Sequence, residues 1–329
     1  MNADRPPALH CLVVTQVLYL AGWGRSGSTV LETVLNQVPG LVGGGELKFI
    51  WRRGLVQDRR CSCGTRFREC PFWARVFTEA FAGVPESRLA ALDAATDRYR
   101  TRHLPALLLP AARRRYATDL DWYRADLATL YRAIATVSGA RAVVDSSKFP
   151  SYLFALLQTP GLDIRVVHIV RDPRAVAYSW QRDKVDPDAP GNGRMPRLAP
   201  AVTGAYWSAW NVATERIART NRLPYLRLRY EDMIADPRAT IGEVLELVGL
   251  PAESVPVSAD GEVGLGVSHQ VSGNPVRFTQ GTIAIRDDAE WARRMGPVPQ
   301  LVVKAVTTPV RQRYGYRSDR PSTRERQSA

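Results

Sequence analysis

Glycines, hydroxyls and one arginine are concentrated in a short segment near the amino terminus that is suited to binding an anion. Gly22-Trp-Gly-Arg-Ser-Gly-Ser-Thr29 follows the apolar run Val17–Ala21, and apolar residues at helical spacing come after it. This order predicts a strand, a tight loop and a helix, so that backbone N–H groups and the positive end of the helix face the anion. Ser28 and Thr29 add hydroxyl donors, and Arg25 adds a bidentate guanidinium.

This segment differs from the P-loop of nucleotidases at one chemically important position. Its glycines match the Gly-x-x-x-x-Gly-Lys pattern, but Ser28 stands where the lysine would be. No strand-end aspartate suited to magnesium stands out, and we therefore predict an anion site without a metal. An ordinary glycine turn is the structural alternative.

A second pair of anion ligands is predicted farther along the chain. The run Ile164–Val170 is typical of a strand buried on both faces, and it ends in Arg171. Ser179 lies two turns into the helix that follows from Arg174 onward. Because ligands of open parallel sheets bind at the carboxyl ends of the strands, Arg171 and Ser179 can converge on one phosphate there.

Together these segments resemble sulfotransferases that use 3′-phosphoadenosine 5′-phosphosulfate (PAPS). Gly24-Arg-Ser-Gly-Ser-Thr29 looks like their 5′-phosphosulfate loop, and Val167–Ser179 looks like their 3′-phosphate motif. Gly43-Gly-Gly-Glu46-Leu47 is predicted to form a glycine-rich loop, and it is similar to a segment of the tyrosylprotein sulfotransferases and their bacterial relatives. Leu228–Met233 resembles a further superfamily element, and Gly273-Asn-Pro-Val-Arg-Phe278 resembles the segment that closes over the nucleotide in bacterial members.

The resemblance implies PAPS as cosubstrate, a hydroxyl-bearing acceptor, and a set of nucleotide-binding residues. These are Gly24, Arg25, Ser26, Gly27, Ser28, Thr29, Arg171, Ser179, Asn274 and Arg277.

Three residues are predicted to carry the chemistry. Glu46 matches the general base of the tyrosylprotein group, and we expect partial burial to raise its pKa. A solvated glutamate that opens the next helix is the alternative. Lys148 follows the strand Ala142–Val144 and is the candidate to stabilise the bridging oxygen, unless it is a surface cation paired with Asp145. Arg25 is expected to hold the phosphosulfate and build positive potential at the leaving group.

Histidine is a rival base, because many sulfotransferases that act on small phenols and alcohols use it. His10 precedes the first strand, His103 lies in a helical insertion, His168 lies within a buried strand, and His269 precedes the nucleotide-closing segment. We interpret His168 as a core residue and expect only His103 to be placed to reach an acceptor.

Cys61, Cys63 and Cys70 form a compact triplet in the chain. A zinc site needs a fourth ligand, and His103 or Cys11 would have to come from afar. The spacing also lacks the paired Cys-x-x-Cys of common zinc modules, so we expect no metal. Bacterial sulfotransferase relatives carry similar Cys-Ser-Cys-Gly segments, which implies a structural turn beside the acceptor pocket.

The elements that must position these residues alternate between strands and helices. Besides the strands above, Tyr225–Arg229 is a predicted strand and 237–248 a predicted helix. We expect an α/β fold with a P-loop-like central parallel sheet, forming a single domain over residues 1–316. A helical insertion at 85–137, broken near Pro105 and Pro110, forms the acceptor site. Residues 183–200 form a mobile loop or a plain connector, and 317–329 a disordered tail.

Composition limits the partners and the location. The chain has 329 residues, 45% of them apolar, and a net charge of +13. The cations are scattered without aromatic-interleaved blocks, so we expect a phosphorylated small molecule as partner rather than nucleic acid. We predict no membrane span and a cytoplasmic location. The oligomeric state is not predicted.

The predicted activity is sulfuryl transfer to a hydroxyl of a small molecule, glycan or lipid in bacterial secondary metabolism. A peptidyl tyrosine is the alternative acceptor. A P-loop kinase is a less favoured function, because it leaves Arg171 and Ser179 without a purpose. A non-enzymatic nucleic-acid binder would explain the charge but neither phosphate motif.

Overall fold

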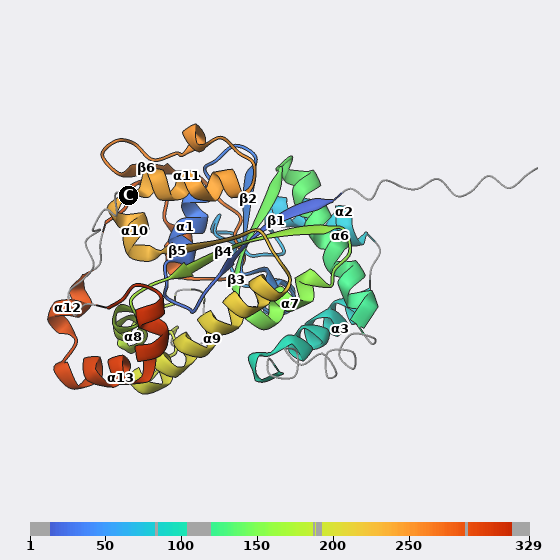
Figure 1. The fold of residues 1–329 in the computed structure, drawn as a ribbon. Coiled ribbons are helices and arrows are strands. Elements are labelled where there is room, and N and C mark those ends of the chain that lie inside the picture. Colours follow the sequence, from blue (N-terminus) through green and yellow to red (C-terminus); the bar gives the residue numbers. More distant parts are fainter. Residues whose placement is uncertain are drawn as a thin grey trace, which may run out of the picture.

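A five-stranded, fully parallel sheet lies at the centre of the molecule, with the strand order β2-β3-β1-β4-β5 (Figure 1). The computed structural model describes residues 14–82, 85–103, 120–186, 188, 193–286 and 289–317. In chain order the strands are β1 (Thr15–Ala21), β2 (Leu41–Gly45), β3 (Ala142–Lys148), β4 (Leu162–Val170) and β5 (Tyr225–Arg229).

The sheet is covered on both faces because its strands are apolar on both sides. Alternate residues of β1 belong to different cores: Leu18 and Leu20 pack on one face, Val17 and Tyr19 on the other. The first face is covered by α1 (Ser28–Leu35), α10 (Tyr230–Ala235) and α11 (Pro237–Leu247). The second is covered by α6 (Asp121–Ser138), α7 (Pro150–Leu157) and α9 (Pro200–Thr220). This three-layer arrangement confirms the predicted α/β class.

The other elements form an outer shell. Helices α2 (Pro71–Phe81) and α3 (Glu86–Thr96) lie beyond α6 and α7, whereas α8 (Pro173–Gln181), α12 (Glu290–Arg294) and α13 (Pro297–Arg313) gather around one end of α9. Strands β6 (Glu262–Leu265) and β7 (Gly281–Ala284) form a separate antiparallel ribbon. The short helical segments are η1 (Leu47–Phe49), the π-helical η2 (Ile50–Val56), η3 (Asp97–Tyr99), η4 (Thr101–His103), η6 (Ala252–Ser254) and η7 (Pro275–Phe278).

The edge strand β2 corrects the sequence interpretation. Its glycines at 43–45 were expected in a loop, but they pair in parallel with β3. Gly45 has φ of +80°, and a Cβ there would lie 2.3 Å from the carbonyl oxygen of Val271. The absence of a side chain at Gly45 thus lets the backbone of Val271 pack directly against the end of the strand. Propensity rules assign such a run of glycines to a loop because glycine is disfavoured in strands.

Parts of three predicted segments lie outside the described residues. The insertion at 85–137 is helical where it is described, but the predicted break at Pro105 and Pro110 falls in 104–119. Of the loop at 183–200, residues 187 and 189–192 are not described, and of the tail only residue 317 is. The mobility of the loop stays a prediction.

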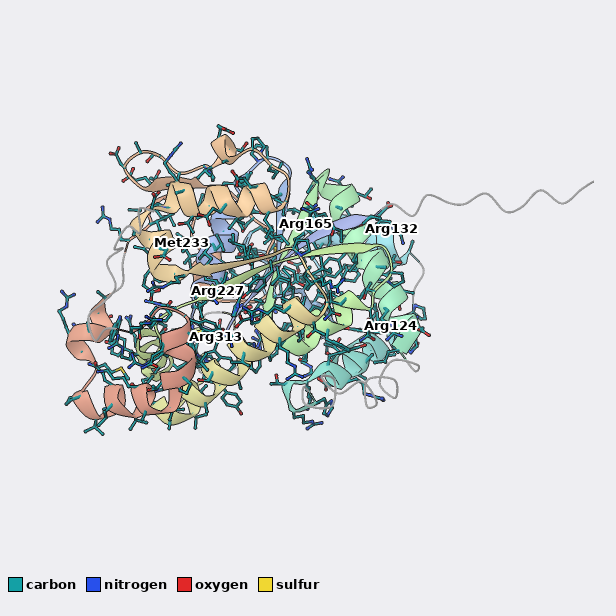
Figure 2. All side chains as sticks on the ribbon, viewed as in Figure 1. Arg124, Arg132, Arg165, Arg227, Met233 and Arg313 are labelled. Atoms are coloured by element: carbon teal, nitrogen blue, oxygen red, sulfur yellow. The ribbon has the colours of Figure 1, made fainter. Side chains whose placement is uncertain are left out.

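The cations are distributed over many elements (Figure 2). Arg124 and Arg132 lie on α6, Arg227 lies on β5, and Arg313 lies at the end of α13. Within the described ranges no helix is long and apolar enough to cross a membrane.

Candidate active site

A cavity of about 430 Å³ opens at the carboxyl edge of the sheet. Each of the five strands is followed at this edge by a residue that lines the cavity, such as Glu46 after β2 and Arg171 after β4. Strand β1 lies between β3 and β4, so the chain leaves it toward one side of the sheet and later returns on the other. Such a switch point leaves the crevice in which open α/β sheets bind ligands.

The predicted phosphate loop lies at the amino end of α1. Gly27 precedes the helix with φ of +97°, and a Cβ there would lie 2.4 Å from the ring of Tyr230. Ser28 and Thr29 occupy the first turn of α1. Both residues line the cavity, and Gly24 and Gly27 of the preceding loop line it as well. First-turn N–H groups have no partner within their helix, and they are therefore donors for an anion.

Arg25 is held over the cavity by aromatic and sulfur contacts that the sequence did not reveal. Its guanidinium lies 5.0 Å from the ring of Trp180 and 3.0 Å from Sδ of Met195. Trp180 in turn donates from Nε1 to the carbonyl of Gly24 at 3.1 Å, which fixes the loop against α8. Arg25 has φ of +74°, a strained conformation of the kind found at functional sites.

The second predicted pair of anion ligands, Arg171 and Ser179, also faces the cavity. Arg171 stacks over the ring of Tyr230 at 4.2 Å, and Ser179 lines the cavity from α8. Trp207 donates from Nε1 to the carbonyl of Arg171 at 3.0 Å. The structure thus brings the loop and the pair Arg171 and Ser179 to one site, as the parallel topology predicted.

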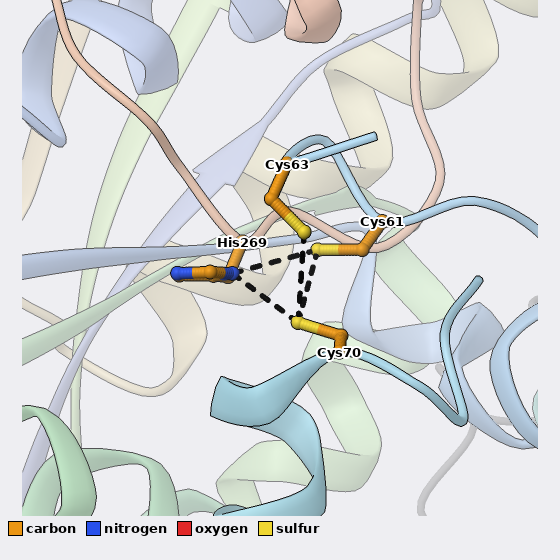
Figure 3. A group of neighbouring side chains, drawn as sticks. All are labelled: Cys61, Cys63, Cys70 and His269. Atoms are coloured by element: carbon orange, nitrogen blue, oxygen red, sulfur yellow. Dashed lines mark hydrogen bonds between the residues drawn. The ribbon is translucent and has the colours of Figure 1, made fainter. Parts of the chain in front are cut away.

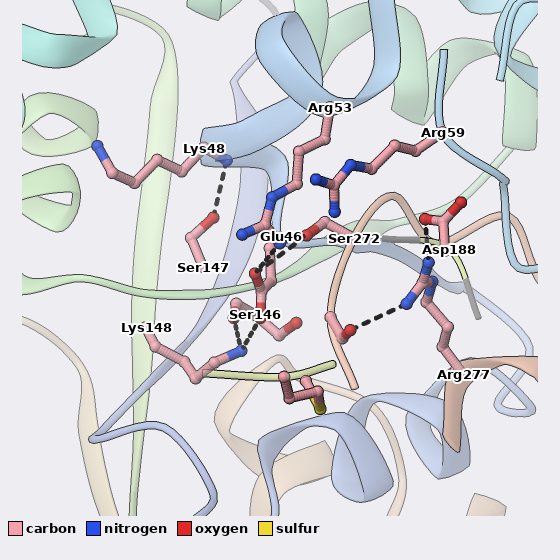
Figure 4. Close-up of polar contacts among 12 residues, drawn as sticks. Glu46, Lys48, Arg53, Arg59, Ser146, Ser147, Lys148, Asp188, Ser272 and Arg277 are labelled. Carbon is pink, nitrogen blue, oxygen red and sulfur yellow. Dashed lines mark hydrogen bonds and ion pairs between the residues drawn. The ribbon is translucent and has the colours of Figure 1, made fainter. Parts of the chain in front are cut away.

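Glu46 and Lys148 form an ion pair inside the cavity (Figure 4). Nζ of Lys148 donates to Oε1 of Glu46 and to the carbonyl of Ser146, both at 2.7 Å. Oε2 of Glu46 accepts from Oγ of Ser272 at 3.2 Å and lies 3.7 Å from Nη1 of Arg53. Each side chain of the pair is only 12% exposed.

The charge state of Glu46 differs from the sequence expectation. Burial alone would raise the pKa of Glu46. The attraction of Lys148 and Arg53, together with hydrogen bonds from Lys148 and Ser272, lowers this pKa by more than burial raises it. The net pKa lies below the usual glutamate range, whereas partial burial was expected to raise it. The expectation failed because two cations face the carboxylate: Lys148, which lies 102 positions away in the chain, and Arg53 on the helical segment that follows Glu46. Glu46 therefore rests ionised.

Lys148 is not a surface cation paired with Asp145. Asp145 is fully buried and accepts from Tyr131 and from the backbone N–H of Ser147, and burial raises its pKa to about 6. Lys148 has φ of +71°, and Trp210 donates from Nε1 to its carbonyl at 2.9 Å. This turn at the end of β3 directs the side chain into the cavity.

Glu32 is a buried carboxylate that the sequence analysis did not identify. It projects from α1, where it accepts from the N–H of Gly45 at 2.6 Å and from Oγ of Ser146 at 2.5 Å. Burial raises its pKa to about 8, although these two hydrogen bonds oppose the shift. Glu32 therefore links α1 to the ends of β2 and β3, immediately before Glu46 and Lys148. The sequence signal that could have identified Glu32 is its place among the apolar, core-facing positions of the helix after the glycine-rich loop.

The three remaining predicted nucleotide ligands lie at different depths. Asn274 lines the cavity, but Ser26 and Arg277 are buried and do not. Arg277 donates to Oδ2 of Asp188 at 2.8 Å and to the carbonyl of Gly273 at 2.9 Å (Figure 4). In this structure Arg277 therefore positions the segment beside the cavity.

Histidine does not compete with Glu46 within the described part of the chain, since no histidine there lines the cavity. His168 is fully buried between Tyr225 and Asn211, at 2.7 and 2.9 Å, and burial lowers its pKa to about 4. His103 lies on η4 outside the cavity, against the expectation that it could reach an acceptor. His269 lies among the cysteines, and His10 is outside the described residues.

A parallel sheet with a glycine-rich loop after β1 and a carboxylate–lysine pair beside that loop defines an α/β protein with a P-loop-like fold. A sequence model of the sulfotransferase family matches residues 18–254, and the chain belongs to this family.

The similar proteins are sulfotransferases as well. Human and mouse carbohydrate sulfotransferase 2 are each 32% identical to this chain, over 30% of it and 25% of their own length. Mouse carbohydrate sulfotransferase 7 is 30% identical over 30% of this chain and 28% of its own length. The chain thus spans only 25–28% of the length of these relatives. The sulfotransferase domain from the curacin biosynthetic pathway has the same fold, with 15% identity and a TM-score of 0.53 over 92% of this chain and 98% of that one.

Proposed function

We propose that this protein transfers a sulfuryl group from PAPS to a hydroxyl group of a small molecule, a glycan or a lipid. The observation that carries the proposal is the position of the Glu46–Lys148 pair in the same cavity as the anion-binding loop. An anion donor and an acceptor hydroxyl can meet there, next to a carboxylate and a cation.

The charges of the cavity favour a multiply anionic ligand. Two carboxylates line it, those of Glu46 and Asp186. Five cationic side chains line it as well: Arg25, Arg53, Lys148, Arg171 and Lys184. This excess of positive charge suits a nucleotide that carries a phosphosulfate at one end and a phosphate at the other.

The nucleotide would be held at its two anionic ends. The N–H groups at the start of α1, with Ser28, Thr29 and Arg25, would bind the 5′-phosphosulfate. Arg171 and Ser179 would bind the 3′-phosphate, and Asn274 would close the cavity beside them. Among the residues that line the cavity no lysine takes the P-loop position, and this disfavours ATP as donor.

The proposed reaction is an in-line displacement at sulfur. The acceptor oxygen forms a new bond to sulfur while the bond from sulfur to the 5′-phosphate oxygen breaks. Glu46 takes the acceptor proton, and the bonding electron pair leaves with the phosphate oxygen. Because Glu46 rests ionised with a lowered pKa, it receives the proton as the new bond forms and acidifies the hydroxyl.

Lys148 is suited to stabilise the leaving oxygen. An ammonium has three N–H donors, and two of them are engaged with Glu46 and the carbonyl of Ser146. The third can reach an oxygen bound between the loop and Glu46, where negative charge develops.

The acceptor would lie against an aromatic wall beside this pair. Phe149 packs edge-on against both Phe49 and Trp210, with centroid distances of 5.6 and 5.2 Å, and all three line the cavity. Such a wall favours an acceptor with an apolar face next to its hydroxyl, which includes sugar rings, phenols and lipid alcohols. A tyrosyl peptide stays the alternative, and a cytoplasmic bacterial setting stays a prediction.

The test is a transfer assay with sulfur-labelled PAPS and a panel of glycan, phenol and lipid alcohols, without added magnesium. We expect label in at least one acceptor, strongly reduced in Glu46→Gln and Arg25→Ala. Magnesium-dependent phosphate transfer from ATP to the same panel, with no sulfated product, would favour a kinase and contradict the proposal.

A further inference from the structure

Three cysteines and one histidine, none of which lines the cavity, lie together (Figure 3). Cys61 and Cys63 belong to the turn before α2, and Cys70 is the residue that precedes this helix. His269 comes from a segment 199 positions after Cys70. In the described part of the chain this is the one cluster of cysteine, histidine and carboxylate side chains with its ligand atoms this close.

All four ligand atoms lie within 4.8 Å of one another, and four of the six distances between them match the edges of a tetrahedral metal site. Sγ of Cys70 lies 3.6 Å from that of Cys61 and 3.7 Å from that of Cys63. Nδ1 of His269 lies 3.3 Å from Sγ of Cys70 and 3.7 Å from Sγ of Cys61. Zinc bonds of about 2.3 Å to sulfur and about 2.0 Å to nitrogen give tetrahedral edges of about 3.5–3.8 Å.

We propose that Cys61, Cys63, Cys70 and His269 bind one structural zinc ion through their three thiolates and Nδ1. Four protein ligands leave no open position, which is the composition of structural rather than catalytic zinc sites. The three cysteines are free, and their sulfurs are much farther apart than the roughly 2.05 Å of a disulfide.

This inference replaces the expectation that the triplet binds no metal. The missing fourth ligand was sought at His103 or Cys11, but His269 is the residue that occupies the position. Nothing in the local spacing indicates this, because the pairing of two distant backbone segments brings His269 there.

The backbone around the cluster is built to hold both segments in register. Cys61 forms an antiparallel bridge with Val271, and the N–H of Ser62 donates to the carbonyl of Gln270 at 3.1 Å. The N–H of Gln270 donates back to Oγ of Ser62 at 2.7 Å. Trp73 donates from Nε1 to the carbonyl of His269 at 2.9 Å. These contacts hold the two ligand-bearing segments in place before a metal binds. Hydrogen bonds around the ligands of metal sites have the same orienting role.

The ion would fasten a segment that leads directly into the cavity. Two residues after Gln270, Ser272 donates to Glu46, and Gly273 and Asn274 line the cavity. The N–H of Glu46 also donates to the carbonyl of Val271 at 2.8 Å. A zinc ion bound by His269 would thus stabilise the segment whose Val271 and Ser272 hydrogen-bond to Glu46, without contacting a substrate.

The first test uses the wild-type protein, purified without a histidine tag and dialysed against metal-free buffer. Elemental analysis should find about one zinc ion per chain, and cobalt exchanged into the site should give the visible spectrum of tetrahedral thiolate coordination. Protein that is folded without zinc, takes up none when refolded with zinc, and gives no such cobalt spectrum would overturn the proposal.

Variants assign the ligands. Cys70→Ser and His269→Ala should lose most of the bound zinc, and their Tm should fall by at least about 5 °C. Cys11→Ser and His103→Ala are the matched controls and should keep the zinc and the Tm. Retention of zinc by His269→Ala with an unchanged cobalt spectrum would contradict the assignment of the fourth ligand, and these readouts do not depend on sulfotransferase activity.

Discussion

Replacement of Glu46 by glutamine separates its role as a base from any role in binding. A glutamine oxygen can still accept from Nζ of Lys148, now 2.7 Å from Glu46, so the ion pair becomes a hydrogen bond from the ammonium to a neutral amide and the fold should persist. The base is lost, however, and general-base catalysis contributes about 10²- to 10⁴-fold to rates. We expect Glu46→Gln to lower kcat by that factor.

The same substitution should strengthen the binding of the product adenosine 3′,5′-bisphosphate. Glu46 and Thr29 both lie close to Gly273. A Cβ built on Gly273 would be 3.9 Å from Oε1 of Glu46 and 3.8 Å from Oγ1 of Thr29. Oε1 of Glu46 is therefore at most about 8 Å from Oγ1 of Thr29, and an anion bound by that hydroxyl would lie at a comparable distance from the carboxylate. Two unit charges at that distance repel by about 2 kcal/mol at an effective dielectric of about 20, which corresponds to up to about 30-fold in Kd.

The assays are steady-state sulfuryl transfer for kcat and calorimetry for bisphosphate affinity. Asp186→Asn is the matched control, because it removes the same charge from the same cavity. This control should also tighten bisphosphate binding but keep kcat within a few-fold of wild type. Full activity in Glu46→Gln, or a loss of affinity in proportion to kcat, would refute the assignment of Glu46 as the base.

Three further predictions concern residues that position the site or bind the nucleotide. Arg171→Ala should weaken bisphosphate binding by about 10- to 100-fold and Ser179→Ala by about fivefold, measured by calorimetry, because charged hydrogen bonds are stronger than neutral ones; equal effects would contradict the paired site. Trp210→Phe should lower kcat several-fold with unchanged bisphosphate affinity, since it loses the hydrogen bond to the Lys148 carbonyl; an unchanged kcat would show that this carbonyl needs no anchor. Glu32 has a folded-state pKa of about 8, above its unfolded value of about 4.5, so its contribution to stability falls by about 1.4 kcal/mol per pH unit between those values. Denaturant titrations should therefore show Glu32→Gln gaining stability relative to wild type from pH 5 to pH 8, and a parallel pH dependence of the two proteins would contradict the buried, protonated state.

The fold and the positions of the candidate anion ligands were largely predictable because their signals are local. Buried runs such as Ile164–Val170 identify strands of a parallel sheet on their own, and glycines followed by hydroxyls identify the loop before α1. Parallel topology then places Arg25 and Arg171 at one edge without further information.

The rest depended on contacts between segments that are far apart in the chain. Strand β2 ends in three glycines, of which Gly45 admits the backbone of Val271, and no propensity rule marks these glycines as a strand. The pKa of Glu46 is lowered most by Lys148, which lies 102 positions away in the chain. His269 joins the cysteines in the same way, through backbone pairing about 200 residues away in the chain.

The central claim is that the cavity binds a bisphosphate nucleotide without magnesium. The most direct measurement is calorimetric titration with adenosine 3′,5′-bisphosphate in the absence of added divalent metal, beside ATP with magnesium. The structure predicts tight bisphosphate binding that is weakened in Arg25→Ala and Arg171→Ala. Failure to bind the bisphosphate, together with magnesium-dependent binding of ATP, would contradict the sulfotransferase mechanism.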